Sequence, residues 1–343
     1  MRKLKNTLYI TSPNAVLSKD GENIVVKIDG REVGRRPIHI LENIVCFNYT
    51  GMSGALIRLC SDHGVAVSLM DAQGRFCGRY QGKVSGNVLL RRTQYRIADC
   101  EETALSISRN MILAKLVNSK RTLNRTLRDH SEVIDAALMT DCIARLSEKI
   151  ESAKEASSFQ SLRGIEGAAA ECYFSAFNEM ILHQKDDFAF RGRSRRPPLD
   201  PVNAMLSYVY TLLAIDCQNA LETVGIDPYV GFFHADRPGR AGLALDLEEE
   251  FRAYLGDRFV LSLINRKQIC GSDFVQKENG AVLFSDAARN KLLAAWQKRK
   301  QETIEHPYLK EKVEIGLLPY CQAMLLSSFL RGDLPDYPPF FVQ

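Results

Sequence analysis

The sequence predicts an α+β protein in which a small β-rich domain, residues 1–95, precedes a larger all-α domain, residues 96–343. The length of 343 residues favours two domains, because a single hydrophobic core stops growing at about 250 to 300 residues. Short β-branched runs separated by turn residues fill the first part, whereas long helical segments with few glycines fill the second. The change from one pattern to the other places the boundary near residue 95.

Four short runs are expected to form strands, because they are rich in β-branched residues and turn signals such as residues 12–14 (SPN) separate them. The runs are residues 7–10, 14–17, 23–28 and 37–40. A short helix is expected over residues 53–64, because Ser53 suits an N-cap and Gly64 suits a helix end. A buried strand is expected to follow over residues 65–70.

Helical periodicity dominates the second part, and four segments carry it: residues 101–116, 132–154, 164–183 and 201–222. A further helix is expected over residues 285–300, because its Ser-Asp start and basic end complement the helix dipole. The final residues 335–341 contain three prolines, which lack the amide hydrogen that a helix needs. This tail is therefore expected to be irregular.

The composition is that of a globular protein, with 25% charged and 45% hydrophobic residues. We find no apolar run of 18 residues and no signal peptide, so a cytoplasmic location without a membrane partner is expected. Nine cysteines are scattered without a CxxC pair, which indicates reduced thiols rather than a zinc ribbon or a disulfide framework. The net charge of +4 is too small to indicate nucleic-acid binding by itself.

Two loops concentrate arginine within the helical part. The first, residues 190–200, carries Arg191, Arg193, Arg195 and Arg196 against one acid, and the second, residues 234–242, carries Arg237 and Arg240. Both are expected to be exposed and to flank helices that bear acids. Arginine suits the recognition of phosphate oxygens, although such stretches also occur as ordinary soluble loops.

Glu166 occupies a position where a core helix should be apolar. With Ala170, Tyr173 and Phe177 it forms one stripe of the expected helix. A carboxylate in a buried stripe costs on the order of several kcal/mol unless a cation or hydrogen-bond donors meet it. Glu166 therefore needs a partner, which could be Arg163, the N–H groups of a helix start or a metal ion.

An imidazole and a run of acids complete a candidate metal site. Asp246 and Glu249 lie three residues apart on an expected helix, so arginine, solvent or a divalent ion must offset their like charges. Carboxylates together with one imidazole, here His234, suit Mg²⁺ or Mn²⁺. The alternatives stay open, since His234 could be a hydrogen-bonded core residue and residues 246–250 could be a solvated helix start.

Four ordered motifs carry a resemblance to a known family. They are residues 162–170 (LRGIEGAAA), 200–208 (DPVNAMLSY), 225–234 (GIDPYVGFFH) and 243–252 (LALDLEEEFR). With these motifs the chain resembles the CRISPR-associated protein 1 family, the integrase and endonuclease of CRISPR adaptation, over nearly its whole length. The arginine loop ahead of residues 197–200 (PPLD) resembles the form that accompanies subtype I-C systems.

The resemblance implies a β-rich domain that dimerises and a helical catalytic domain. It assigns Glu166, His234 and Glu249 as ligands of Mg²⁺ or Mn²⁺, with Asp246 as a supporting acid, while the choice among Asp246, Glu249 and Glu250 stays open. The implied reaction is attack of a DNA 3′ hydroxyl on a phosphodiester of the CRISPR repeat, which inserts a foreign double-stranded DNA fragment as a new spacer. The implied partners are double-stranded DNA, a second copy of the chain as a homodimer, and CRISPR-associated protein 2.

The candidates for contact with the DNA backbone are Arg191, Arg193, Arg195, Arg196, Arg237, Arg240 and Arg252. Two other functions remain compatible with the sequence. One is a stand-alone metal-dependent nuclease that acts on branched DNA in repair. The other is a non-catalytic DNA-binding scaffold whose acids only begin a helix.

Overall fold

The computed structural model describes residues 3–48, 50–71, 74–83, 86–194 and 196–342. The chain forms two compact units. The first contains Met1–Ser85, Phe284–Thr303 and Glu314–Gly316, and the second contains Gly86–Leu283, Ile304–Val313 and Leu317–Gln343. The expected order, a β-sheet region followed by a largely helical region, is confirmed. The assignment of domains to residues 1–95 and 96–343 stays a prediction.

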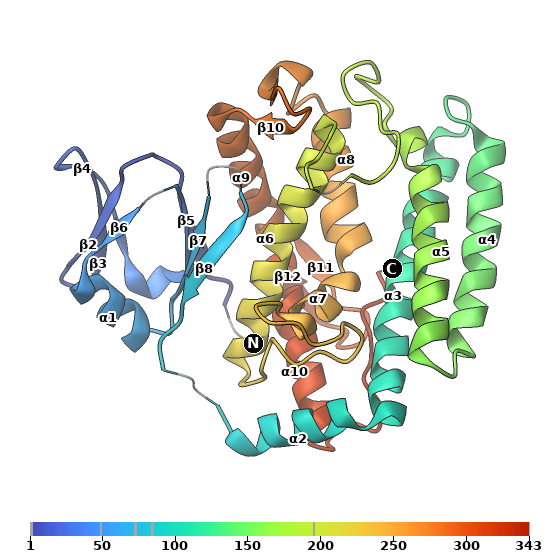
Figure 1. Ribbon diagram of the computed structural model, residues 1–343, viewed down its shortest axis with the longest axis horizontal. Coiled ribbons are helices and arrows are strands. Elements are labelled where there is room, and N and C mark those ends of the chain that lie inside the picture. The colour runs from blue at the N-terminus through green and yellow to red at the C-terminus, as the bar shows by residue number, and fades with distance from the viewer. Residues whose placement is uncertain (1–2, 49, 72–73, 84–85, 195, 343) are drawn as a thin grey trace. The chain divides into compact units, whose positions relative to one another are not determined.

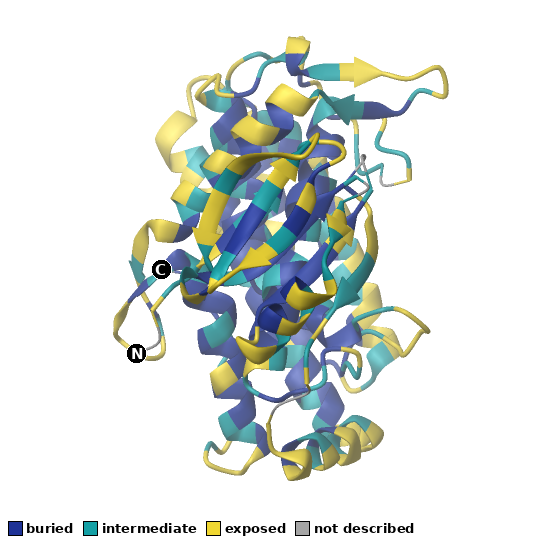
Figure 2. Ribbon diagram, turned by 90° about the vertical axis from the view of Figure 1, so that its left-hand side faces the viewer, coloured by how far each residue is buried: buried dark blue, intermediate teal, exposed yellow. Residues whose placement is uncertain are grey.

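The first unit contains two four-stranded sheets, in the orders β1-β5-β7-β8 and β4-β3-β2-β6. The strands are β1 (Asn6–Ile10), β2 (Val16–Asp20), β3 (Asn23–Ile28), β4 (Arg31–Pro37), β5 (Leu41–Phe47), β6 (Gly51–Met52), β7 (Ala66–Met70) and β8 (Phe76–Tyr80). β5 pairs in parallel with β1 and β7, and β3 pairs antiparallel with β2 and β4. Central β5 is buried along most of its length, whereas edge strand β4 is largely exposed (Figure 2).

Helix α1 (Gly54–Asp62) closes the core of the first unit. Ser53 caps it by accepting a hydrogen bond from the Leu56 N–H, as expected. Its buried side chains Leu56, Leu59 and Cys60 join the strand residues in one hydrophobic cluster. A second helix, α9 (Asp286–Gln301), belongs to this unit although it lies more than 200 residues later in the chain. Ser285 caps α9, which confirms the expected helix start.

The second unit is built from helices. They are α2 (Val88–Asp99), α3 (Glu101–His130), α4 (Ala136–Lys154), α5 (Phe159–Ser175), α6 (Pro201–Thr223), α7 (Gly242–Glu249), α8 (Arg258–Asn265) and α10 (Leu318–Leu330), with the 3₁₀ turn η2 (Phe177–Met180) and the π-helical turn η3 (Arg252–Asp257). Helices α3, α4 and α5 pack side by side, and α6 packs on α7 and α10 (Figure 1). Short strand pairs occur later in the chain, β9 (Phe274–Gln276) with β10 (Val282–Phe284) and β11 (Thr303–Glu305) with β12 (Lys312–Glu314).

Several expected boundaries are wrong. Residues 37–40 are not a strand, because Pro37 ends β4 and Ile38–Ile40 form the 3₁₀ turn η1. The helix expected over residues 101–116 continues to His130, since α3 buries polar side chains such as Asn118 and Thr122 that hide its periodicity. The helix expected over residues 164–183 begins at Phe159, where Ser158 caps it, and ends at Ser175. In contrast, the tail over residues 335–341 is irregular, as expected.

The remaining expectations concern thiols and membranes. All nine cysteines are free, and six of them are buried, in agreement with reduced thiols. In the described part of the chain, no helix is both long enough and apolar enough to cross a membrane.

Candidate active site

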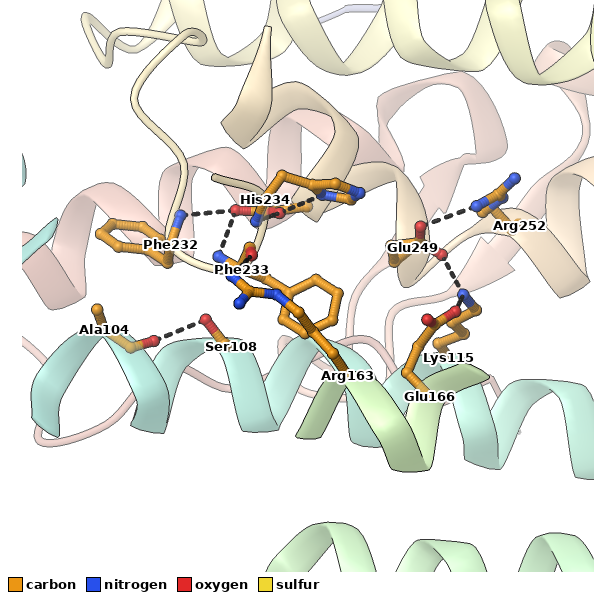
Figure 3. A network of polar contacts seen from close by, with 11 residues as sticks. Ala104, Ser108, Lys115, Arg163, Glu166, Phe232, Phe233, His234, Glu249 and Arg252 are labelled. Atoms are coloured by element: carbon orange, nitrogen blue, oxygen red, sulfur yellow. Dashed lines mark hydrogen bonds and ion pairs between the residues drawn. The ribbon is translucent and has the colours of Figure 1, made fainter. Parts of the chain in front are cut away.

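Two carboxylates from different helices meet at one lysine in the second unit. Glu166 extends from α5 and Glu249 is the last residue of α7, while Lys115 extends from α3 between them (Figure 3). The Nζ of Lys115 lies 2.8 Å from Oε2 of Glu249 and donates a hydrogen bond to Oε1 of Glu166. The partner that Glu166 requires is therefore Lys115. Arg163 instead donates to the carbonyl of Phe233 at 3.1 Å.

Glu249 is held as a charged group in a buried position. Its side chain is 7% exposed, and Arg252 Nη1 donates to its Oε1 at 2.8 Å. Burial by itself raises the pKa of Glu249, but the charges of Arg252 and Lys115 outweigh burial and lower this pKa to about 2. A carboxylate that stays ionised in this way can offer oxygen to a hard cation at neutral pH.

Asp246 organises the segment that carries His234. Its Oδ2 accepts the backbone N–H groups of Phe232 at 2.7 Å and Phe233 at 3.0 Å, and its Oδ1 accepts that of His234 at 2.9 Å. Oδ1 also lies 2.6 Å from Nδ1 of the His234 ring. Because an ionised carboxylate only accepts, we assign the ring proton to Nδ1, which leaves the Nε2 lone pair available for a ligand.

A glycine makes this close approach possible. A Cβ at Gly231 would lie 2.9 Å from Oδ2 of Asp246 and 2.9 Å from the carbonyl carbon of Gly242. Gly231 therefore lets the backbone of the 231–234 segment reach a side chain that is only 1% exposed.

Glu250 is directed to the C-terminal tail. Its Oε1 accepts the hydroxyl of Tyr337 at 2.5 Å, and its Oε2 accepts Gln322 Nε2 at 2.9 Å and the Phe340 N–H at 2.7 Å. Burial raises the pKa of Glu250 to about 8 despite these hydrogen bonds. All of the acids from Asp246 to Glu250 are buried, so the alternative of a solvated helix start is wrong. Of the three candidate acids, Glu249 alone faces Glu166 through a shared partner.

The predicted DNA-contact arginines fall into two groups. Arg191, Arg196 and Arg237 are exposed and Arg240 is partly exposed, while Arg195 lies outside the described residues. Arg193 donates to Oδ1 of Asn203 at 2.6 Å and lies 5.4 Å from the ring centre of Tyr210. Arg252 lies 4.2 Å from the same ring centre and pairs with Glu249. Arg193 and Arg252 therefore contact residues around the site. The other described arginines of this set face solvent.

A pocket opens beside the paired acids. Lys115, Glu166 and Arg252 line it together with Tyr173, Tyr210 and Asp257. The hydroxyls of Tyr173 and Tyr210 both donate to Asp257, the former at 2.9 Å. Asp257 ends the π-helical turn η3, a type of backbone irregularity that is frequent at functional sites.

The carboxylates suit a divalent ion in charge and in chemistry. Oε2 of Glu249 is buried, and the cation that it faces among the described residues is the Lys115 ammonium at 2.8 Å. Two carboxylates already gathered at one cation, with an imidazole nitrogen from the neighbouring segment, form a donor set typical of Mg²⁺ or Mn²⁺. As the side chains stand, no three His, Cys, Asp or Glu groups in the described ranges lie close enough to hold a metal ion together.

Sequence reasoning missed Lys115, although the signal was present. Lys115 follows Met111 by four residues and precedes Asn118 and Thr122 by three and seven, so it lies on a buried face of α3. A charged ammonium on a buried helix face needs a partner of opposite charge or hydrogen-bond acceptors, just as the Glu166 carboxylate needs a cation or donors. The expected end of the helix at residue 116 concealed the stripe.

Comparison with known proteins gives the following matches. Residues 8–298 match the family model described as CRISPR associated protein Cas1. The chain is 48% identical over 345 residues to the CRISPR-associated endonuclease Cas1 2 of Rhodospirillum rubrum, covering 99% of both chains. It is 49% identical over 340 residues to the CRISPR-associated endonuclease Cas1 1 of Chlorobaculum tepidum, again covering 99% of both.

Two solved structures share the fold. One is a casposase bound to its integration product, with a TM-score of 0.85 and 23% identity, covering 99% of this chain and 95% of that one. The other is a chain of a Cas6-RT-Cas1–Cas2 complex, with a TM-score of 0.83 and 22% identity, covering 100% of this chain and 37% of that one.

Proposed function

The chain belongs to the Cas1 family of CRISPR-associated proteins, and on that premise we propose that it acts on DNA through Glu166, His234 and Glu249. It is an endonuclease and integrase of CRISPR adaptation. One observation carries the assignment of residues: Glu166 and Glu249, which come from separate helices, meet at a single cation. In this proposal they hold a Mg²⁺ or Mn²⁺ ion together with Nε2 of His234.

The residues have separate roles in this proposal. Glu166 and Glu249 would supply negative oxygen ligands, and Asp246 holds the His234 ring through Nδ1, so that Nε2 would be the nitrogen ligand. When bound, a divalent ion neutralises charge on the phosphoryl oxygens and lowers the pKa of a coordinated hydroxyl. The nitrogen ligand favours Mn²⁺ over Mg²⁺ in affinity.

The reaction is displacement at a phosphodiester of the CRISPR repeat. A 3′ hydroxyl of a foreign double-stranded fragment attacks the phosphorus and loses its proton as the new P–O bond forms. The old P–O3′ bond breaks, so the 5′-phosphate side of the cut strand is joined to the fragment and the other side leaves with a free 3′ hydroxyl. Water in place of the hydroxyl gives hydrolytic cleavage. The residues provide charge and orientation, and none of them forms a covalent bond to DNA.

In this proposal, exposed arginines bind the phosphates of the DNA backbone. Arg191, Arg196, Arg237 and Arg240 have accessible side chains, and guanidinium groups bind phosphate oxygens in a bidentate manner. Arg193 and Arg252 support the site from within. Arg195 remains a candidate from the sequence alone.

The assembly and setting are also proposals. A homodimer that joins CRISPR-associated protein 2 is supported by the fold shared with a chain of the Cas6-RT-Cas1–Cas2 complex. Dimerisation through the β-rich region and membership of a subtype I-C system are proposed from the resemblance in sequence, while a cytoplasmic location stays the expectation stated from the sequence.

The test is an integration assay with purified protein, a repeat-containing plasmid, a short DNA duplex and the partner protein. Joined products support integration, whereas cleavage alone supports the stand-alone nuclease. Glu166→Gln and His234→Ala should reduce both products by at least the roughly 10- to 100-fold that loss of a residue supporting a metal ligand costs. The matched control is Glu171→Gln, an exposed glutamate on the same helix. Full activity of both site variants would indicate the non-catalytic scaffold.

A further inference from the structure

Lys115 lies between two acids of the site and forms an ion pair with each of them. Its side chain is 15% exposed, and it lies between Glu166, which is 23% exposed, and Glu249, which is 7% exposed. Each of these three residues comes from a different helix. The contact therefore links α3, α5 and α7 through charge at one point (Figure 3).

The lysine occupies the position between the same two carboxylates that a divalent ion would need to bridge. Oε1 of Glu249 is already held by Arg252, so the oxygen that remains for another cation is Oε2, which faces Lys115. On Glu166 the ammonium holds Oε1. A metal ion close enough to bind both carboxylates would lie against the ammonium, where two positive charges repel strongly in a partly buried setting.

We propose that Lys115 is an internal cation that pairs Glu166 with Glu249 in the metal-free protein, and that a divalent ion binds by displacing it. The inference deepens the proposed function and rests on it, because the same two carboxylates serve as metal ligands there. The lysine offsets the repulsion between the two acids, which otherwise would destabilise the fold where α5 and α7 each contact α3. The cost of this stability is a weaker apparent affinity for the metal, because the ion pairs must be broken first.

The test is Mn²⁺ binding, measured by electron paramagnetic resonance on metal-stripped protein. Lys115→Met retains much of the side-chain volume and removes the charge, so it should bind Mn²⁺ about 5- to 150-fold more tightly than the parent, if the lysine and the ion are coupled as strongly as two linked binding events usually are. Its melting temperature without metal should be lower, and Mn²⁺ should raise that temperature by more than in the parent. The charge-retaining Lys115→Arg should not bind Mn²⁺ more tightly than the parent.

A matched control is Lys154→Met, which removes an exposed lysine paired with Glu151 at 2.8 Å. It should leave Mn²⁺ affinity unchanged. A second measurement needs no variant, because acetylation of Lys115 in the parent can be followed by mass spectrometry. Its rate should rise when Mn²⁺ is added, while the rate at Lys154 stays constant.

The outcomes separate this inference from the proposed function. If the parent binds Mn²⁺ and Glu166→Gln abolishes binding, but Lys115→Met has equal or weaker affinity, the displacement is refuted and the metal site stands. An acetylation rate at Lys115 that Mn²⁺ does not raise refutes it as well. If neither the parent nor Lys115→Met binds Mn²⁺, the metal site and the displacement both fail.

Discussion

Replacing Asp246 by asparagine tests the part of the site that orients His234. The carboxylate accepts three backbone N–H groups and faces Nδ1 of the ring, and its side chain is fully buried. Asparagine keeps the shape but has one acceptor atom instead of two. In either orientation of the amide, its NH₂ group faces an N–H donor whose hydrogen bond the Asp246 carboxylate accepts in the parent.

The magnitude follows from the two orientations of the amide. With nitrogen at the Oδ2 position, the N–H groups of Phe232 and Phe233 lose their acceptor. With nitrogen at the Oδ1 position, the His234 N–H loses its acceptor and Nδ1 must give up its proton. Each buried donor left without an acceptor costs about 1–3 kcal/mol, so the first orientation costs about 2–6 kcal/mol and the second, with one such donor, about 1–3 kcal/mol. The amide adopts the orientation of lower energy, so Asp246→Asn should lower the free energy of unfolding by about 1–3 kcal/mol.

The assay combines denaturant unfolding with ¹⁵N NMR of the histidine ring at neutral pH. In the second orientation the proton moves to Nε2, so Mn²⁺ binding through that nitrogen should weaken about 10- to 100-fold. The control is Asp236→Asn, an exposed acid two residues after His234, which should change neither quantity. An Asp246→Asn protein with unchanged stability, tautomer and Mn²⁺ affinity would refute this account of the site.

Two further predictions concern stability. Burial raises the pKa of the Glu250 carboxyl from 4.5 to about 8. The folded state therefore binds the proton of Glu250 more tightly than the unfolded state does. The resulting stabilisation of the folded state is complete below pH 4.5 and disappears as pH rises through 8. Glu250→Gln should flatten this dependence in urea unfolding at several pH values, and an unchanged pH slope would contradict it. A Cβ at Gly256 would lie 2.7 Å from Cε1 of Tyr210, so Gly256→Ala should cost about 1–3 kcal/mol. The control in thermal unfolding is Gly164→Ala, because a Cβ at Gly164 meets nothing within 4 Å, and it should not destabilise the protein. Equal unfolding midpoints for Gly256→Ala and Gly164→Ala would contradict the steric argument.

Local signals predicted the parts of the fold that depend on neighbours in sequence. Ser53 and Ser285 were expected to begin helices, and both accept the capping hydrogen bond. The strand over residues 23–28 was also predicted with its observed bounds. Caps and short alternating runs are recognisable because their hydrogen bonds and side-chain periods span only a few residues.

Contacts between distant segments were not predictable. The membership of α9 in the first compact unit depends on packing with strands that lie more than 200 residues earlier. The full length of α3 was concealed because its buried Asn118 donates to the carbonyls of Glu250 and Phe340. A polar residue satisfied by distant backbone groups appears in sequence as an exposed position.

The same distinction between local signals and contacts of distant segments applies to the candidate site. The sequence by itself determined that Glu166 needs a partner, because a carboxylate in a buried helical stripe is stable only with a cation or hydrogen-bond donors, and its motifs determined the family. Tertiary structure decided that the cation is Lys115, and it gave three similar acids different tasks: Asp246 holds the His234 segment, Glu249 faces Glu166, and Glu250 binds the C-terminal tail. These acids lie within five residues on one short stretch, so only the direction in which each side chain leaves the backbone distinguishes them.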